Sequence, residues 1–211
     1  EYKDNSFAFQ LEGEHTALAG EKGMTNIRLH DFIYNDGIEE NRLKNLYIYD
    51  DNTDKERTIT VNSDILTADI IGKFSIEGIY AGALNIVRTH MPSLHIAKGK
   101  KFHNNFLYRI ELKDSRLLTK ILDLPFTITE RSIISGSCID SNSSFDIDAE
   151  INNINIGSTN LSAINLKGKS SKSDLNIDAN IIKPSTAKSR NENEGDLILN
   201  LHSSIRQDSI N

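Results

Sequence analysis

Histidine and serine side chains are present, but their spacing fits neither a metal site nor a nucleophile. His90 and His95 lie five residues apart and straddle Pro92, whereas zinc hydrolases place two histidines on one helical turn with a carboxylate. The run Ser135-Gly136-Ser137-Cys138 lacks the first glycine of a nucleophile elbow. The sequence also contains no glycine-rich phosphate loop and no dinucleotide fingerprint.

Paired carboxylates are the other candidate chemistry, because glycosidases need two of them. Asp146, Asp148 and Glu150 alternate with apolar residues, so they are expected on the solvated side of a strand. The acidic run at 50–54 lacks the glycine and the closing glutamate of a calcium loop. We therefore expect no catalytic residue, no metal and no cofactor: the sequence predicts a protein that is not an enzyme.

The amino-acid composition limits the kinds of molecule that this protein is expected to bind. The net charge is −6, from 30 acidic and 24 basic side chains, which argues against nucleic acid and against an anionic membrane surface. Cys138 is the only cysteine, so an internal disulfide is impossible, and we expect this side chain to be a small buried hydrophobe. Hydrophobic residues make up 37% and aromatic residues 7%, which is lean for a compact enzyme.

Apolar and polar residues alternate strictly over much of the chain, so any functional site must be built on these segments. Phe145, Ile147 and Ile151 alternate with acidic residues, and Leu175 and Ile177 alternate with polar ones. Roughly a dozen such segments are separated by Asn, Asp, Ser and Gly turns. This period indicates strands with one apolar and one solvated face. The predicted fold class is mainly β: an extended, curled antiparallel or mixed sheet, either a trough (a β-taco) or a half-barrel, with two short helices covering one part.

Two stretches depart from the strand pattern. Apolar residues recur at helical spacing over 76–94, and a short helix is predicted from an N-cap at Asp114 to a stop at Pro125. The chain 1–211 is thus expected to be a single β-rich segment, with 77–124 a helical insert containing one strand. Residues 183–195 are predicted to form a polar, mobile loop.

The sequence also repeats itself at a constant offset. The run 43–48 (Leu-x-x-Leu-x-Ile) reappears at 161–166 as Leu-x-x-Ile-x-Leu. The same offset carries the strand at 59–61 onto 177–179, and Ile27 onto Phe145. Two copies of a three-strand unit predict a module that stacks on itself. The alternative is chance similarity among alternating strands.

Several runs, taken together, are similar to one known family. They are Ile71-Gly72-Lys73-Phe74-Ser75, Met91-Pro92-Ser93-Leu94, His103-Asn104-Asn105-Phe106, Asp114 to Leu122 with Leu124-Pro125, Ile134-Ser135-Gly136, Phe145-Asp146-Ile147 and Leu161-Ser162-Ala163-Ile164. Over residues 25–205 the chain resembles the Bacteroidetes branch of the TamB family (translocation and assembly module TamB), one of the AsmA-like envelope bridge proteins.

The resemblance implies a location and a role. Members of this family are very long, are anchored in the inner membrane and cross the periplasm as a sheet curled into a trough with an apolar floor. They are linked to outer-membrane protein assembly with a barrel partner and to phospholipid transport. The chain would then be an internal or C-terminal, periplasmic piece of a longer protein, and its partners would be phospholipid acyl chains and an outer-membrane barrel assembly partner.

The groove residues follow from the alternation. They are predicted to be Phe145, Ile147, Ile151, Leu175, Ile177, Leu197, Leu199 and Leu201; in a closed sandwich the same side chains would be core. The alternative function is a structural or adhesive β-rich module of a surface protein that binds other proteins. A small lipoprotein carrier with a half-barrel is a third hypothesis. Exposed sheet edges are further expected to allow edge-to-edge self-association.

Overall fold

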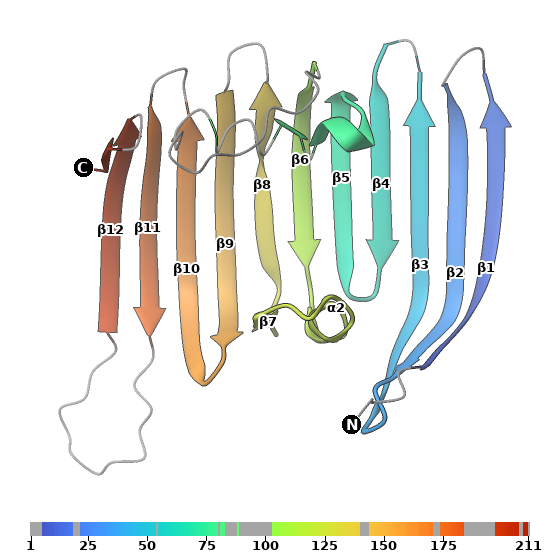
Figure 1. The fold of residues 1–211 in the computed structure, drawn as a ribbon, viewed down its shortest axis with the longest axis horizontal. Coiled ribbons are helices and arrows are strands. Elements are labelled where there is room, and N and C mark those ends of the chain that lie inside the picture. The colour runs from blue at the N-terminus through green and yellow to red at the C-terminus, as the bar shows by residue number, and fades with distance from the viewer. Residues whose placement is uncertain are drawn as a thin grey trace.

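The protein is one open antiparallel sheet, a single layer in which neighbouring strands follow chain order (Figure 1). The computed structural model describes residues 6–18, 22–53, 55–79, 81–82, 88, 103–139, 144–170, 174–183, 197–206 and 209–210. The path runs β1-β2-β3-β4-β5-β6-β8-β9-β10-β11-β12-β13, and β7 lies off it, paired with β9. The predicted fold class, mainly β and extended, is confirmed.

The strands differ in length, and those at the centre are short. Their bounds are β1 (Ser6–Ala17), β2 (Gly23–Asn35), β3 (Glu40–Asn52), β4 (Arg57–Ser63), β5 (Leu66–Lys73), β6 (Asn105–Leu112), β7 (Phe126–Ile128), β8 (Ser132–Ile139), β9 (Ser144–Ile156), β10 (Thr159–Ser170), β11 (Leu175–Lys183), β12 (Leu197–Arg206) and β13 (Ser209–Ile210), with helix α2 at Arg116–Leu122. Because β4, β5, β6 and β8 are shorter than β3 and β9, a notch opens in one rim of the sheet, and α2 and β7 occupy it (Figure 1).

The polypeptide between β6 and β8 closes this notch. Ile128 of β7 is opposite Ile154 of β9, and Ile133 of β8 is opposite Glu150 of β9. β7 and β8 therefore pair with successive parts of β9, with a short break between them. Helix α2 buries Leu117 against Tyr34 and Leu43. The lower ends of β2 and β3 curve toward α2 (Figure 1), and this contact joins the curved part of the sheet to its centre.

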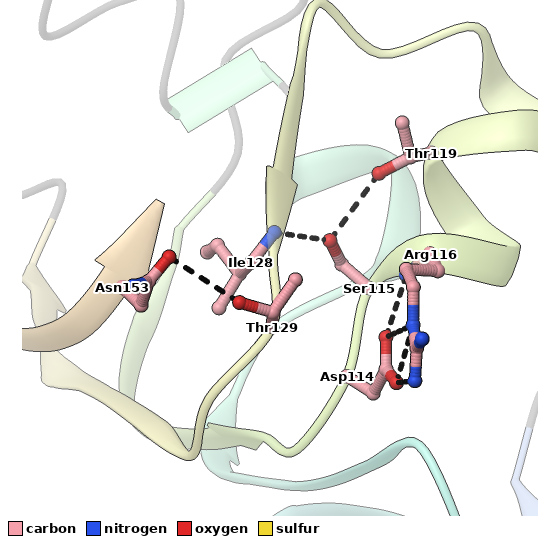
Figure 2. Close-up of polar contacts among 7 residues, drawn as sticks. All are labelled: Asp114, Ser115, Arg116, Thr119, Ile128, Thr129 and Asn153. Atoms are coloured by element: carbon pink, nitrogen blue, oxygen red, sulfur yellow. Dashed lines mark hydrogen bonds and ion pairs between the residues drawn. The ribbon is translucent and has the colours of Figure 1, made fainter. Parts of the chain in front are cut away.

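Ser115 ties α2 to β7 (Figure 2). Its backbone N–H donates to the Ile128 carbonyl at 2.8 Å, and its hydroxyl accepts the Ile128 N–H at 2.7 Å. The predicted N-cap at Asp114 is wrong: the N-cap is Ser115, and its hydroxyl makes no cap bond. The physical reason is that β7 uses this hydroxyl, while the Asp114 carboxylate accepts the N–H of Arg116 at 2.9 Å. The helix ends at Leu122, before Pro125, with Asp123 in the left-handed conformation.

The other predicted irregular segments are only partly described. Residues 76–79 and 81–82 are helical, in agreement with the first predicted helix, and the chain re-enters the sheet near the buried Asn104. Asn104 donates from its side-chain nitrogen to the Gly78 carbonyl at 2.7 Å, which fastens this helical turn to the start of β6. Most of the predicted helix 76–94, and the predicted loop 183–195 beyond Lys183, lie outside the described residues.

The strand register agrees with one part of the predicted internal repeat and contradicts another. Ile48 is opposite Val61 in β3–β4, and the repeat carries this pair onto Leu166 opposite Ala179, which is observed in β10–β11. By contrast, Ile27 pairs with Ile48, whereas Leu166 pairs with Ala149 instead of Phe145. The repeat is therefore confirmed for one strand pair and wrong for the strand before it. Hairpin turns set register, and the turn before β10 is shorter than the turn before β3.

Candidate functional site: the apolar face of the sheet

Directly opposite residues in neighbouring strands share a face, so the register shows which side chains gather on each side. One row runs Ile70, Tyr108, Gly136, Ile147, Gly168, Ile177 across β5, β6, β8, β9, β10 and β11. The rows beside it are apolar on the same side. We call this side the apolar face, and the other side the polar face. Alternation along every strand is thus combined by the register into one continuous apolar surface.

The eight predicted groove residues all belong to the apolar face. Five of them are partly buried: Phe145, Ile147, Ile151, Leu175 and Ile177. Leu197, Leu199 and Leu201 on β12 are 64%, 53% and 49% exposed. Phe145 and Ile151 also pack against buried clusters, so these two contribute to the core as well as to the surface.

Burial on the apolar face is greatest where other segments lie over it. Tyr34 and Leu43 are covered by α2, Phe106 and Cys138 pack with Phe74 and Ile79 near the first helical turn, and a third buried cluster lies beside β7. Cys138 is buried as predicted. Ala149, Ala179 and Ile205 on this face are also buried, whereas most of its other described side chains are partly exposed, and exposure is greatest at the two ends of the sheet, on β1 and β12.

Two bulges keep the apolar side chains on one side. Asp31 of β2 and Ala163 of β10 have positive φ angles of 50° and 47°, and each lies at a register irregularity. Strict alternation would send Leu29 and Phe32 of β2 to opposite faces, yet both contact the same cluster. A bulge changes which side chains face the core and bends the strand, so the apolar face continues through the curved region of β1–β3.

Two glycines, which carry no side chain, lie at the centre of the apolar face. Gly136 and Gly168 are on either side of Ile147 in the central row. The Tyr108 ring lies over Gly136, and its hydroxyl donates to the Asp146 carbonyl at 3.2 Å. Burial, followed by the nearby Cys138 and Asp146, raises the pKa of Tyr108 to about 12. The phenol is therefore neutral at physiological pH and presents an aromatic surface.

One ion pair on this face was missed by the sequence analysis. Asp50 and Arg57 are 19% and 14% exposed, and the guanidinium binds the carboxylate with two hydrogen bonds of 2.8 and 2.5 Å. The Arg57 guanidinium also lies 5.7 Å from the centre of the Phe74 ring, and the hydrogen bond to Asp50 raises the pKa of Arg57. The apolar face therefore has a paired charge beside the β3–β4 turn. A helpful signal was present: two charged residues flank a turn within otherwise alternating strands.

The polar face is organised by columns of opposite charge. Acidic Asp146 and Asp148 on β9 are opposite Lys169 and Lys167 on β10, and the Lys167 ammonium lies 3.5 Å from the Asp148 carboxylate. Lys167 is in turn opposite Asp178 on β11. The prediction that these acids are on the solvated side is confirmed. Cross-strand pairs of this kind help select the register.

The residues considered for chemistry do not converge. Ser135 and Ser137 are on the polar face and Cys138 is on the apolar face, while His90 and His95 lie outside the described residues. Across the described ranges, no group of three or more His, Cys, Asp or Glu side chains is arranged to hold a metal ion. Among these same residues, no helix has the length and apolar character required to cross a bilayer.

No protein-family model, no curated protein and no solved structure matches this chain.

Proposed function

We propose that the apolar face holds phospholipid acyl chains, and that the chain is a segment of a periplasmic bridge that moves lipid between membranes or assists outer-membrane protein assembly. One observation carries the proposal: apolar side chains of strands from β1 to β12 share one face, and three of them on each of the outer strands β1 and β12 are about half exposed or more. A globular domain would bury such a surface, since large exposed apolar patches usually mark a binding site.

The dimensions and energetics suit an acyl chain. Strands about 4.8 Å apart make the face on the order of 50 Å long between β1 and β12. Moving a hydrocarbon chain out of a bilayer into water costs about 0.8 kcal/mol for each CH₂ group. A continuous apolar surface removes much of this cost, and headgroups can stay in water at the rim. Such a function needs no catalytic residue, metal or cofactor.

The resemblance to TamB-like proteins supports the same function and supplies the proposed location. An open sheet with one apolar face is the form that the resemblance implies, and the structure has this form. In this proposal the chain is the periplasmic part of an inner-membrane-anchored protein, working with an outer-membrane barrel partner.

Site-specific photo-crosslinking tests the proposal. A photoreactive amino acid at Ile147 or Ile177 on the apolar face is expected to capture phospholipid when the protein is expressed in a bacterial envelope, with mass spectrometry identifying the adduct. Asp178 is the matched control, because it is the next residue of β11 and faces the other side. Capture at Ile147 and Ile177 without capture at Asp178 supports a lipid path.

Two outcomes would count against it. Equal capture at Asp178 would mean that the protein is merely near a membrane. Capture of polypeptide in place of lipid at Ile147 and Ile177 would instead support the protein-binding module, with the apolar face binding client strands.

A further inference from the structure

One part of the apolar face carries a group of polar side chains. The central row of this face continues across β4 at Ile59 and then reaches Asp50, Thr25 and His15 on β3, β2 and β1. Arg57 of β4 binds Asp50 from the neighbouring row. We call His15, Thr25, Asp50 and Arg57 the polar island. It lies close to the β3–β4 turn and therefore near one rim of the sheet.

Contacts within the polar island fix where its side chains lie. The His15 Nδ1 atom is 2.9 Å from the Thr25 hydroxyl oxygen. A Cβ added at Gly23 would lie 2.9 Å from the His15 ring carbon Cε1, so the ring leans over this glycine. Asp50 and Arg57 form the ion pair described above. Four consecutive strands thus each place one polar side chain on the same side of the sheet.

The Asp50–Arg57 pair retains hydrogen-bonding capacity for a ligand. Asp50 accepts one bond from Nε of Arg57 and one from a terminal nitrogen. Within the described part of the chain, the other terminal nitrogen of Arg57 makes no hydrogen bond. Each Asp50 oxygen accepts one of these bonds, and a carboxylate oxygen has a further lone pair. The pair can therefore take up an anionic and a cationic partner at the same time.

An apolar row lies directly beside the polar island. Its members are opposite one another across β1–β5: Gly13, Ile27, Ile48, Val61 and Ala68. The four side chains beyond Gly13 are all partly exposed. This row is two residues along each strand from the central row, a distance of about 7 Å. A ligand with a polar head and apolar tails can therefore contact the polar island and the apolar row together.

The charges of the polar island select the kind of head. One carboxylate and one guanidinium give no net charge, so a purely anionic head would gain the Arg57 contact but would be repelled by Asp50. A zwitterionic head gains at both residues, because its phosphate accepts from Arg57 and its ammonium donates to Asp50. Such charge-assisted hydrogen bonds are the strong ones. Thr25 and His15 extend the polar row by about 10 Å, which accommodates the glycerol and ester oxygens.

We infer that the polar island binds the headgroup of a zwitterionic aminophospholipid. Its phosphodiester lies at Arg57, its ammonium lies at Asp50, and its acyl chains lie on the apolar row. This inference rests on the proposed function, and it adds the class of phospholipid that the face prefers.

Titration with water-soluble, short-chain lipids tests the inference. Dihexanoyl phosphatidylethanolamine and dihexanoyl phosphatidylglycerol have the same tails and differ in the charge of the head. Nuclear magnetic resonance, following the backbone amides of Thr25 and Ile59 below the micelle concentration, gives the dissociation constants. We expect the ethanolamine lipid to bind roughly tenfold more tightly than the glycerol lipid. Glycerophosphoethanolamine, which has the same head without tails, is expected to bind at least about tenfold more weakly than the ethanolamine lipid.

A paired variant shows whether the polar island causes the preference. Asp50→Leu combined with Arg57→Met removes both charges, so its dissociation constants for the two lipids are expected to agree within about twofold. Glu111→Gln combined with Arg131→Gln is the matched control. It removes a pair with two hydrogen bonds of 2.8 Å on the polar face, and the tenfold preference is expected to remain. Circular dichroism checks that both variants keep the fold.

The outcomes separate this inference from the proposed function. Equal dissociation constants for the two lipids in the parent protein would overturn the inference and leave a lipid-holding face. A preference that survives in the Asp50→Leu, Arg57→Met variant would also overturn it. Glycerophosphoethanolamine bound as tightly as the lipid would assign the polar island to a free polar solute. Binding of neither lipid would contradict the proposed function and the inference with it.

Discussion

The Asp50–Arg57 pair allows a quantitative test of how dry the apolar face is. Exposed ion pairs contribute roughly 0–1 kcal/mol, whereas removing one partner of a buried pair costs about 3–5 kcal/mol, because the other charge is left without compensation. With exposures of 19% and 14% and two direct hydrogen bonds, this pair is close to the buried case. We expect Asp50→Leu and Arg57→Met each to lower the free energy of unfolding by about 3 kcal/mol.

The double variant separates charge from packing. Asp50→Leu combined with Arg57→Met replaces both charges by apolar groups, and the methionine keeps an unbranched stem near the Phe74 ring. Replacement of a whole buried pair by apolar residues is often neutral or stabilising. The double variant is therefore expected to be more stable than either single variant and within about 1 kcal/mol of the parent protein.

Urea unfolding followed by circular dichroism measures these differences. With a denaturant slope of about 2 kcal/mol per molar urea, each single variant should lower the midpoint by about 1.5 M. Single variants that each cost less than about 1 kcal/mol would place the pair among wet surface pairs. The same conclusion would follow if the double variant lost the sum of the two single losses, and the apolar face would then be hydrated beside the β3–β4 turn.

Two further predictions concern the central row of the apolar face. Gly136→Ala should lower the free energy of unfolding by about 2 kcal/mol, because its Cβ would lie 1.9 Å from the backbone carbonyl oxygen of Asp146. Gly168→Ala should lower it by less than about 1 kcal/mol. The Cβ added at Gly168 would meet only the Ile147 methyl at 2.6 Å, and that side chain can rotate. Equal shifts of the urea midpoint would refute this comparison. Tyr108 has a folded-state pKa raised from 10.0 to about 12, so the stability it contributes is complete below pH 10 and is lost as the pH rises from about 10 to 12. Tyr108→Phe should flatten this part of the stability–pH curve, and an unchanged curve would contradict the assignment.

The sequence by itself determined the strands and their two sides. Alternating side chains point to opposite faces of any strand, so Ile147, Ile177 and Leu199 could be assigned to the apolar face without coordinates. The same rule assigned Asp146 and Asp148 to the polar face. Alternation is a property of consecutive residues, so these predictions need no information about the rest of the fold.

Tertiary structure decided where alternation changes phase. Asp31 and Ala163 adopt positive φ, although neither is a glycine, and no local pattern marks them. Neighbouring strands and two different buried clusters hold these bends: Tyr34 and Leu43 pack beside Asp31, and Ile164 packs beside Ala163. For the same reason, Asp50 could be placed on the apolar face only once the phase of β3 was known.

Pairing between distant segments was also beyond the sequence. β5 and β6 are adjacent in the sheet although more than thirty residues separate them, and Ser115 became the N-cap because β7 returns to bind its hydroxyl. Local propensity favoured Asp114 for that role, but a hydrogen bond from a strand outside the helix outweighed it. Side-chain periodicity fixes which way a residue points, whereas register, bulges and caps depend on partners that only the folded chain brings together.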